Sequence, residues 1–254
     1  LVAHLHGMQG VRGSSPLRST IFPDALSATP FGTSRLWHMA NSVDPLERHT
    51  DYGEIALEEG SLLPDPIAQF RLWLQEADEE GIYEPNGMVV STIDPDGSPT
   101  IRTVLLRGVS DEGFAFYTDY TSQKGVALAN NPDLAAVFPW YSLHRQVKIR
   151  GTAERVSAQD SDAYFSSRPR DSRIGAWASD QSQPIPSRSA LEDKVQLMEE
   201  KFSGVDDVPR PDKWGGFLIR PRSIEFWAGR RSRLHDRVRF VRNDSGWAPE
   251  RLQP

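Results

Sequence analysis

Short segments in which hydrophobic and polar residues alternate are the main regularity of the chain, and they predict β-strands. The clearest case is 223–240, where two alternating segments flank a Gly-containing turn and predict a β-hairpin. The turn signal at 94–97, Asp-Pro-Asp-Gly, lies in a group of strands that predicts an antiparallel meander. Strands are expected at 88–93, 100–107, 114–118, 134–140, 146–155 and 214–219, and in the hairpin.

A 3.6-residue period replaces the alternation in a few places. Ile67, Phe70 and Leu74 predict a helix that packs on the sheet, beginning at the Asp-Pro pair 65–66 because Asp suits an N-cap and Pro the first helical position. Further helices are expected at 121–130, 157–167 and 189–202, and a long loop at 174–188.

These elements predict a mainly β fold with peripheral helices. Six or more strands with mostly short connections favour a closed or split β-barrel. Residues 1–45 are rich in Gly, Ser, Thr and Pro without a sustained period, so we expect a disordered or weakly ordered N-terminal extension. Residues 46–254 are expected to form one domain, which includes a C-terminal hairpin region at 220–254.

Composition excludes several classes of protein. The net charge of -6 and the pI near 5.6 argue against general nucleic-acid binding. With no Cys and no paired-His motif, no metal site is expected. The sequence shows neither an apolar run of membrane-spanning length nor a secretory signal pattern, and a cytoplasmic location is expected.

Arginine is concentrated in the hairpin region. Residues 220–242 hold eight Arg against two acids, Glu225 and Asp236. On a strand, side chains alternate between faces, which predicts one cationic and one largely apolar face. The cationic face would carry Arg233, His235, Arg237 and Arg239, and the apolar face Leu234, Val238 and Phe240. Charged residues commonly protect sheet edges, but Arg also suits bidentate binding of phosphate.

The stretch Ile224-Glu225-Phe226-Trp227, followed by Arg233-Leu234-His235-Asp236-Arg237, resembles the C-terminal signature of the pyridoxine (pyridoxamine) phosphate oxidase family. The resemblance extends over roughly residues 46–254. It implies an FMN-binding split β-barrel that forms a homodimer, with the flavin in a cleft between the subunits. The implied reaction oxidises pyridoxamine or pyridoxine 5'-phosphate to pyridoxal 5'-phosphate, with O2 as electron acceptor and H2O2 as a product.

The resemblance also assigns residues to the two ligands. The last position of 102–107, commonly Lys in the family, is Arg107 here, and Gln123 stands where the family has Arg. FMN is expected at Arg102, Thr103, Val104, Leu105, Leu106, Arg107, Tyr117, Thr118, Gln123, Lys124, Gln146, Gln181, Ser182, Trp227 and Arg237. The substrate is expected at Arg107, Tyr164, Arg168, Ser172, Arg233 and His235, with Arg233 and His235 over the substrate ring as the catalytic residues.

Spacing alone bears on two of these assignments. Arg102 and Arg107 differ in parity, so on a regular strand they face opposite sides and suit two anions better than one. Surface Arg bracketing a buried strand is an equally good interpretation. Tyr164 and Arg168 lie four residues apart on a predicted helix and therefore share a face.

The segment 48–52, Arg-His-Thr-Asp-Tyr, resembles the Arg-x-x-Tyr lid of the same family with its spacing shifted by one residue, which makes Arg48, His49 and Tyr52 lid candidates. Two other functions stay open from the sequence. One is a deazaflavin-dependent split-barrel reductase, and the other is a non-catalytic binder or carrier of pyridoxal phosphate.

Overall fold

The computed structural model describes residues 44, 46–47, 51–53 and 56–254. By internal contacts the chain divides into two compact units, Leu1–His49 and Thr50–Pro254, and every helix and strand given below belongs to the second. The expected N-terminal extension falls almost wholly outside the described residues, as do Arg48 and His49 of the expected lid. No helix in the described part of the chain is long and apolar enough to cross a membrane.

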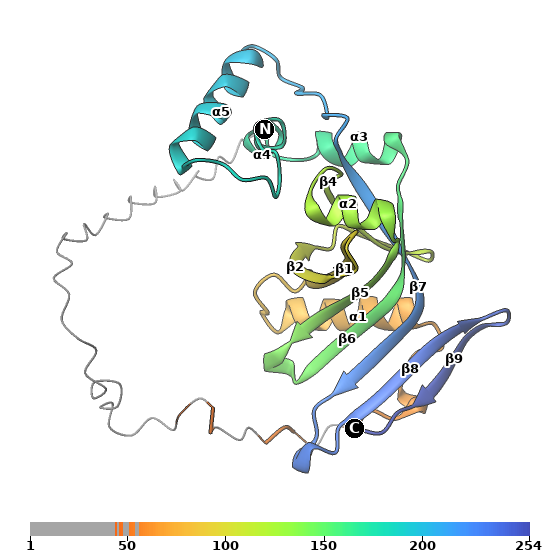
Figure 1. The fold of residues 1–254 in the computed structure, drawn as a ribbon. Helices are drawn as coiled ribbons and strands as arrows, with labels where there is room; N and C mark the ends of the chain where they lie inside the picture. The colour runs from red at the N-terminus through yellow and green to blue at the C-terminus, as the bar shows by residue number, and fades with distance from the viewer. Residues whose placement is uncertain (1–43, 45, 48–50, 54–55) are drawn as a thin grey trace, which may run out of the picture. The chain divides into compact units, whose positions relative to one another are not determined.

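An antiparallel sheet of nine strands is the main element of the described fold (Figure 1). Its strand order is β2-β1-β5-β6-β7-β4-β3, and β8 extends from β7 and β9 from β8. The strands are β1 (Gly87–Ile93), β2 (Pro99–Leu105), β3 (Gly108–Ser110), β4 (Gly113–Asp119), β5 (Asp133–Trp140), β6 (Arg145–Arg155), β7 (Trp214–Ala228), β8 (Asp236–Asn243) and β9 (Gly246–Arg251). The mainly β prediction is confirmed.

Five α-helices and three short 3-10 helices surround the sheet in the described residues. They are α1 (Pro66–Glu79), α2 (Gln123–Asn130), α3 (Ala158–Ser166), α4 (Arg170–Ala178), α5 (Arg188–Lys201), η1 (Glu59–Ser61), η2 (Tyr141–Leu143) and η3 (Arg231–Arg233). Four of the helices begin at capping residues in the sequence. Asp65 accepts hydrogen bonds from the backbone of Ile67 and Ala68 at the start of α1, and serines cap α2, α3 and α5.

The core forms where the sheet curls around α1 (Figure 1). Phe70 of α1 is fully buried, with ring centroids 4.9 Å from Phe114, 4.8 Å from Phe138 and 6.1 Å from Trp140. A second, smaller cluster lies between α4 and α5 around Ile174 and Phe202. Strand β7 runs from the end of the fold that carries α3, α4 and α5 to the end that carries β8 and β9 (Figure 1).

The connectivity around β2 differs from the predicted meander. β2 pairs only with β1, whereas β4 pairs with β7 and with the unpredicted short strand β3. After Leu106, whose side chain is buried, the backbone N–H of Arg107 donates to the carbonyl of Ala115 in β4, so the chain leaves β1 and continues as β3.

Three other predictions are corrected. The expected loop at 174–188 begins only after Ala178, because α4 continues through its first residues. The strand at 214–219 and the first arm of the hairpin are one continuous strand, β7, and β9 was not predicted.

The hairpin between β7 and β8 is confirmed, but its second arm begins only at Asp236. Ser232 and Arg233 have φ angles of 55° and 60°, in the left-handed region, so the strand alternation does not extend back to them. Arg233 and His235 therefore lie in the connection and not on the predicted cationic face. Arg237 and Arg239 lie on β8, as predicted for that face.

The fold makes one stability prediction. Phe70→Ala should lower the free energy of unfolding by about 3–5 kcal/mol, because it leaves a cavity among three aromatic rings. Urea denaturation measures this, with Asp78→Ala, on the exposed side of the same helix, as a control expected within about 0.5 kcal/mol of the wild type. Equal effects of the two changes would contradict this account of the core.

Candidate active site

A cavity of about 820 Å³ lies between β2, β4, α2, α3 and the start of β7. Most of the residues expected at the two ligands line it. They are Arg102, Thr103, Val104, Leu105, Arg107, Tyr117, Thr118, Lys124, Tyr164, Arg168, Ser172 and Gln181. Segments from 102 to 181 thus converge on one cavity, together with Ser167, Pro169 and Trp214, which the sequence did not indicate.

One group of cations in the cavity is formed by Arg102 and Lys124. The guanidinium of Arg102 donates to the hydroxyls of Thr92 and Thr100, both at 2.7 Å, which fixes its position. Lys124 is only 8% exposed, and its ammonium donates to the hydroxyl of Thr118 at 3.1 Å and to the side-chain oxygen of Gln181 at 2.7 Å.

Burial, and then the neighbouring Arg102, lower the pKa of Lys124 to about 8. The oxygens that accept its hydrogen bonds are neutral, and the carboxylate of Asp119 offsets the lowering of its pKa only in part, so its charge is costly to bury. A bound phosphate would offset this cost, and the donor set here therefore fits an anionic group.

A second group of cations is formed by Arg107 and Arg168. Burial lowers the pKa of Arg168, and Arg107 lowers it further. The Nη1 atom of Arg168 is buried without a hydrogen-bond partner, and its guanidinium lies 4.6 Å from the ring centroid of Trp214. This buried, unpaired donor can bind an anionic group without giving up a hydrogen bond within the protein.

Aromatic rings line the wall next to Arg168. The rings of Tyr117 and Tyr164 stack at 3.9 Å, and Trp214 is close to parallel with both, at 5.6 Å and 6.1 Å. The side chains of Tyr164 and Arg168 come together in the cavity, but Arg168 lies in the turn after α3, which ends at Ser166, so the predicted helical spacing is not the reason.

Arg102 and Arg107 line the same cavity, so the expectation that they face opposite sides is wrong. That expectation assumed a regular strand, whereas β2 ends at Leu105. Arg102 nevertheless lies near Lys124, and Arg107 lies near Arg168. The cavity therefore still offers two positions for an anion.

The cavity-lining residues do not include Leu106, Gln123 or Ser182. The side chain of Leu106 is buried in the core. The amide of Gln123 donates to Asp94 at 2.6 Å, in the turn between β1 and β2. Ser182 has a φ of 72° and is exposed in the loop between α4 and α5.

The remaining expected residues gather at the connection between β7 and β8. The rings of Trp227 and His235 lie 4.6 Å apart, and Tyr52 lies 5.3 Å from His235. A Cβ at Gly229 would come within 2.8 Å of the Tyr52 ring, so this glycine allows the close packing. Tyr52 thus contacts an expected catalytic residue.

Charge and hydrogen bonds fix the side chains of His235 and Arg237 at the β7–β8 connection. Nδ1 of His235 accepts from the backbone N–H of Arg230 at 3.1 Å, so the neutral ring carries its proton on Nε2. Burial and Arg233 lower the pKa of His235. Arg237 donates to Glu225 at 2.8 Å and to the carbonyl of Gln253 at 3.1 Å.

The cavity and the residues at the β7–β8 connection lie at opposite ends of β7. Trp214 lines the cavity, whereas Trp227 pairs with Gln146 at the other end of the strand. A strand rises about 3.3 Å per residue, so these tryptophans are roughly 40 Å apart along β7. One copy of the chain therefore does not bring Arg233 and His235 to Arg107 and Arg168.

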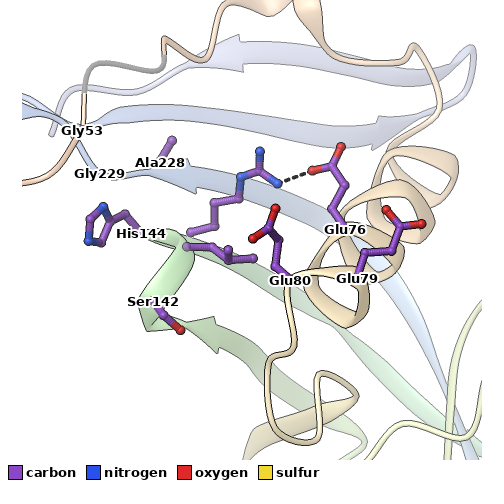
Figure 2. A pocket seen from close by; sticks show the side chains of 10 residues that line it. Gly53, Glu76, Glu79, Glu80, Ser142, His144, Ala228 and Gly229 are labelled. Carbon is purple, nitrogen blue, oxygen red and sulfur yellow. Dashed lines mark hydrogen bonds and ion pairs between the residues drawn. The ribbon is translucent and has the colours of Figure 1, made fainter.

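A separate cavity of about 410 Å³ lies behind the β7–β8 connection (Figure 2). Glu76 and Glu79 of α1, Glu80 just after it, and His144 line it (Figure 2). Arg145 also lines it and is paired with Glu76. Its acidic lining is unsuited to phosphate, whereas the cationic lining of the larger cavity suits it.

The fold and the larger cavity define a split-barrel protein with a lining suited to phosphorylated ligands. Residues 74–202 match the family model described as pyridoxamine 5'-phosphate oxidase. Residues 214–254 match the pyridoxine 5'-phosphate oxidase C-terminal dimerisation region. The chain belongs to the pyridoxine/pyridoxamine 5'-phosphate oxidase family, and the resemblance found in the sequence is confirmed.

Similar proteins agree with this assignment. The pyridoxine/pyridoxamine 5'-phosphate oxidase of Rubrobacter xylanophilus is 50% identical over 204 residues, 80% of this chain and 94% of the relative. PhzG from Burkholderia lata 383, solved in complex with tetrahydrophenazine-1-carboxylic acid, matches with a TM-score of 0.73 and 29% identity, over 79% of this chain and 98% of that chain.

A pyridoxamine 5'-phosphate oxidase-related, FMN binding protein from Nostoc punctiforme PCC 73102 has the same fold. It matches with a TM-score of 0.60 and 20% identity over 76% of this chain and 99% of that chain. The predicted split-barrel fold is confirmed.

Proposed function

We propose that this protein is an FMN-dependent oxidase that converts pyridoxamine 5'-phosphate and pyridoxine 5'-phosphate to pyridoxal 5'-phosphate, with O2 as acceptor and H2O2 as a product. The observation that carries the proposal is a single cavity lined by two separate pairs of cations, Arg102 with Lys124 and Arg107 with Arg168, in a chain of this family. Two groups match two phosphorylated ligands, the cofactor and the substrate.

The first group would hold the phosphate of FMN. Lys124 and Arg102 supply positive charge, and Thr118 and Gln181 supply polar atoms beside them. When bound, FMN supplies the redox chemistry, accepting two electrons from the substrate and passing them to O2.

The second group would hold the phosphate of the substrate. Arg107 and Arg168 provide the charge, and the hydroxyls of Tyr164 and Ser172 line the same part of the cavity. Because the unpaired Nη1 of Arg168 is buried there, its hydrogen bond to a phosphate oxygen would replace no bond within the protein.

The site is completed in a homodimer, with FMN at the interface. The C-terminal region that matches the family's dimerisation region contains the β7–β8 connection, which carries Arg233 and His235. In an isologous dimer the connection of each subunit can reach the cavity of its partner, so two complete sites form. Gln146, Trp227 and Arg237 would contact FMN from the partner's side.

Arg233 and His235 would then act on the substrate ring. His235 is largely neutral at pH 7 and presents Nε2–H as a donor, while Arg233 supplies a fixed positive charge. Together they orient the ring and stabilise negative charge near its phenolic oxygen. Alignment of the donor carbon with the cofactor is the main contribution of the protein.

The alternative functions are not favoured. Relatives at 45–50% identity are named as oxidases, which argues against a deazaflavin-dependent reductase and against a binder without activity. A cytoplasmic location stays a prediction.

An oxygen electrode tests the function directly. The purified protein should bind FMN and, on addition of pyridoxamine 5'-phosphate, consume O2 and release H2O2. Arg233→Ala and His235→Ala should each lower turnover by about 100-fold while FMN stays bound, because the ring loses its alignment. Wild-type turnover in both variants would refute the roles given to them, and no O2 consumption by the wild type would refute the function.

Lys124 predicts a pH dependence of FMN binding. The pKa of its ammonium in the free protein is lowered to about 8, so the charge is lost as the pH rises through 8. The Kd for FMN, measured by quenching of flavin fluorescence, should rise roughly tenfold between pH 7 and pH 9. Lys124→Arg keeps its charge in this range and should remove most of this dependence; equal pH profiles for the two proteins would contradict the assignment.

A further inference from the structure

The segment 179–182, between α4 and α5, carries Gln181, which lines the large cavity. Residues 180–189 are exposed, and the backbone from 179 to 187 forms no helix or strand. A segment of this kind loses conformational entropy when it is held in one place, so specific contacts must hold it. Gln181 provides one contact, since its side-chain oxygen accepts from Thr118 at 2.8 Å and from Lys124 at 2.7 Å.

Lys213 provides a second contact. Its ammonium donates to the backbone carbonyl of Ser179 at 2.7 Å and to Asp180 at 2.9 Å. The same ammonium lies 3.4 Å from Oδ2 of Asp119, at the end of β4. Lys213 therefore connects the segment to the end of β4, one residue along from the direct contact between Thr118 and Gln181.

The charges explain why a cation is needed at this position. Asp119 is 3% exposed, and its Oδ2 has no hydrogen-bond partner, so the nearby ammonium provides its counter-charge. Hydrogen bonds from Lys194 and Lys213 lower the pKa of Asp180 to about 2. Without Lys213, the carboxylates of Asp119 and Asp180 would repel each other across the base of the segment.

We propose that Lys213 is a positioning residue for the cofactor, holding Asp180 against Asp119 so that Gln181 stays beside Lys124 at the phosphate position. The inference rests on the proposed function, in which FMN is the ligand of this part of the cavity. It adds a residue that lines neither the cavity nor the β7–β8 connection.

Titration of the FMN-free protein with FMN tests this role. Lys213→Met should raise the Kd for FMN at least about tenfold, and Lys213→Arg should restore most of the affinity because it keeps the charge. Lys194→Met is the matched control. It removes the other lysine on Asp180, but Lys194 belongs to α5 and makes no contact with Asp119, so the Kd should change less than about twofold.

A double-mutant cycle separates this role from a general loss of stability. Asp180→Asn should raise the Kd as Lys213→Met does, and the double variant should bind no more weakly than Lys213→Met alone. Additive effects of the two changes, or equal losses in Lys213→Met and Lys213→Arg, would overturn the proposal.

Amide hydrogen exchange of the FMN-free protein gives a readout that does not depend on the cofactor. Exchange in residues 179–187 should become faster in Lys213→Met and stay unchanged in Lys194→Met. Unchanged exchange in Lys213→Met overturns the inference. If the two variants show these exchange results but the wild-type protein does not bind FMN, the proposed function is refuted instead.

Discussion

The length of β7 is the constraint on which the arrangement of the site depends. Fifteen residues from Trp214 to Ala228 form one strand that is paired along its length with β6, and with β4 or β8 on its other side. Such a strand cannot shorten or fold back, so the cavity at one end and the connection at the other remain apart. A second copy of the chain, related by a twofold axis, supplies the missing half to each site.

Buried positive charge is the second organising feature. The whole chain is acidic, with a net charge of -6, yet the cavity concentrates Arg102, Arg107, Lys124 and Arg168. Burial lowers the pKa of Lys124, Arg102 and Arg168, because it disfavours their charged forms. Anionic ligands offset that cost, so the same burial favours the binding of phosphate groups.

The sequence predicted the local elements well because caps and periodicity are local signals. Asp65 caps α1 where expected, and Ser122 and Ser157 begin the helices expected at 121–130 and 157–167. Pairing between strands far apart in the sequence could not be predicted, since the partner of β4 lies about a hundred residues away in β7. The placement of Arg233 depends on a left-handed backbone conformation that no periodicity indicates. Trp214, Lys213 and the acidic cavity near Glu76 belong to no sequence motif, so the sequence did not indicate them.

A mixed dimer tests the shared site most directly. Arg168→Ala removes a residue of the cavity, and Arg233→Ala removes one of the connection, so each homodimer should be nearly inactive. Two different affinity tags would allow purification of the dimer that contains one subunit of each kind. If each site combines the cavity of one subunit with the connection of the other, this dimer has one intact site and should show about half of the wild-type turnover per dimer. A mixed dimer as inactive as both parents would contradict the account.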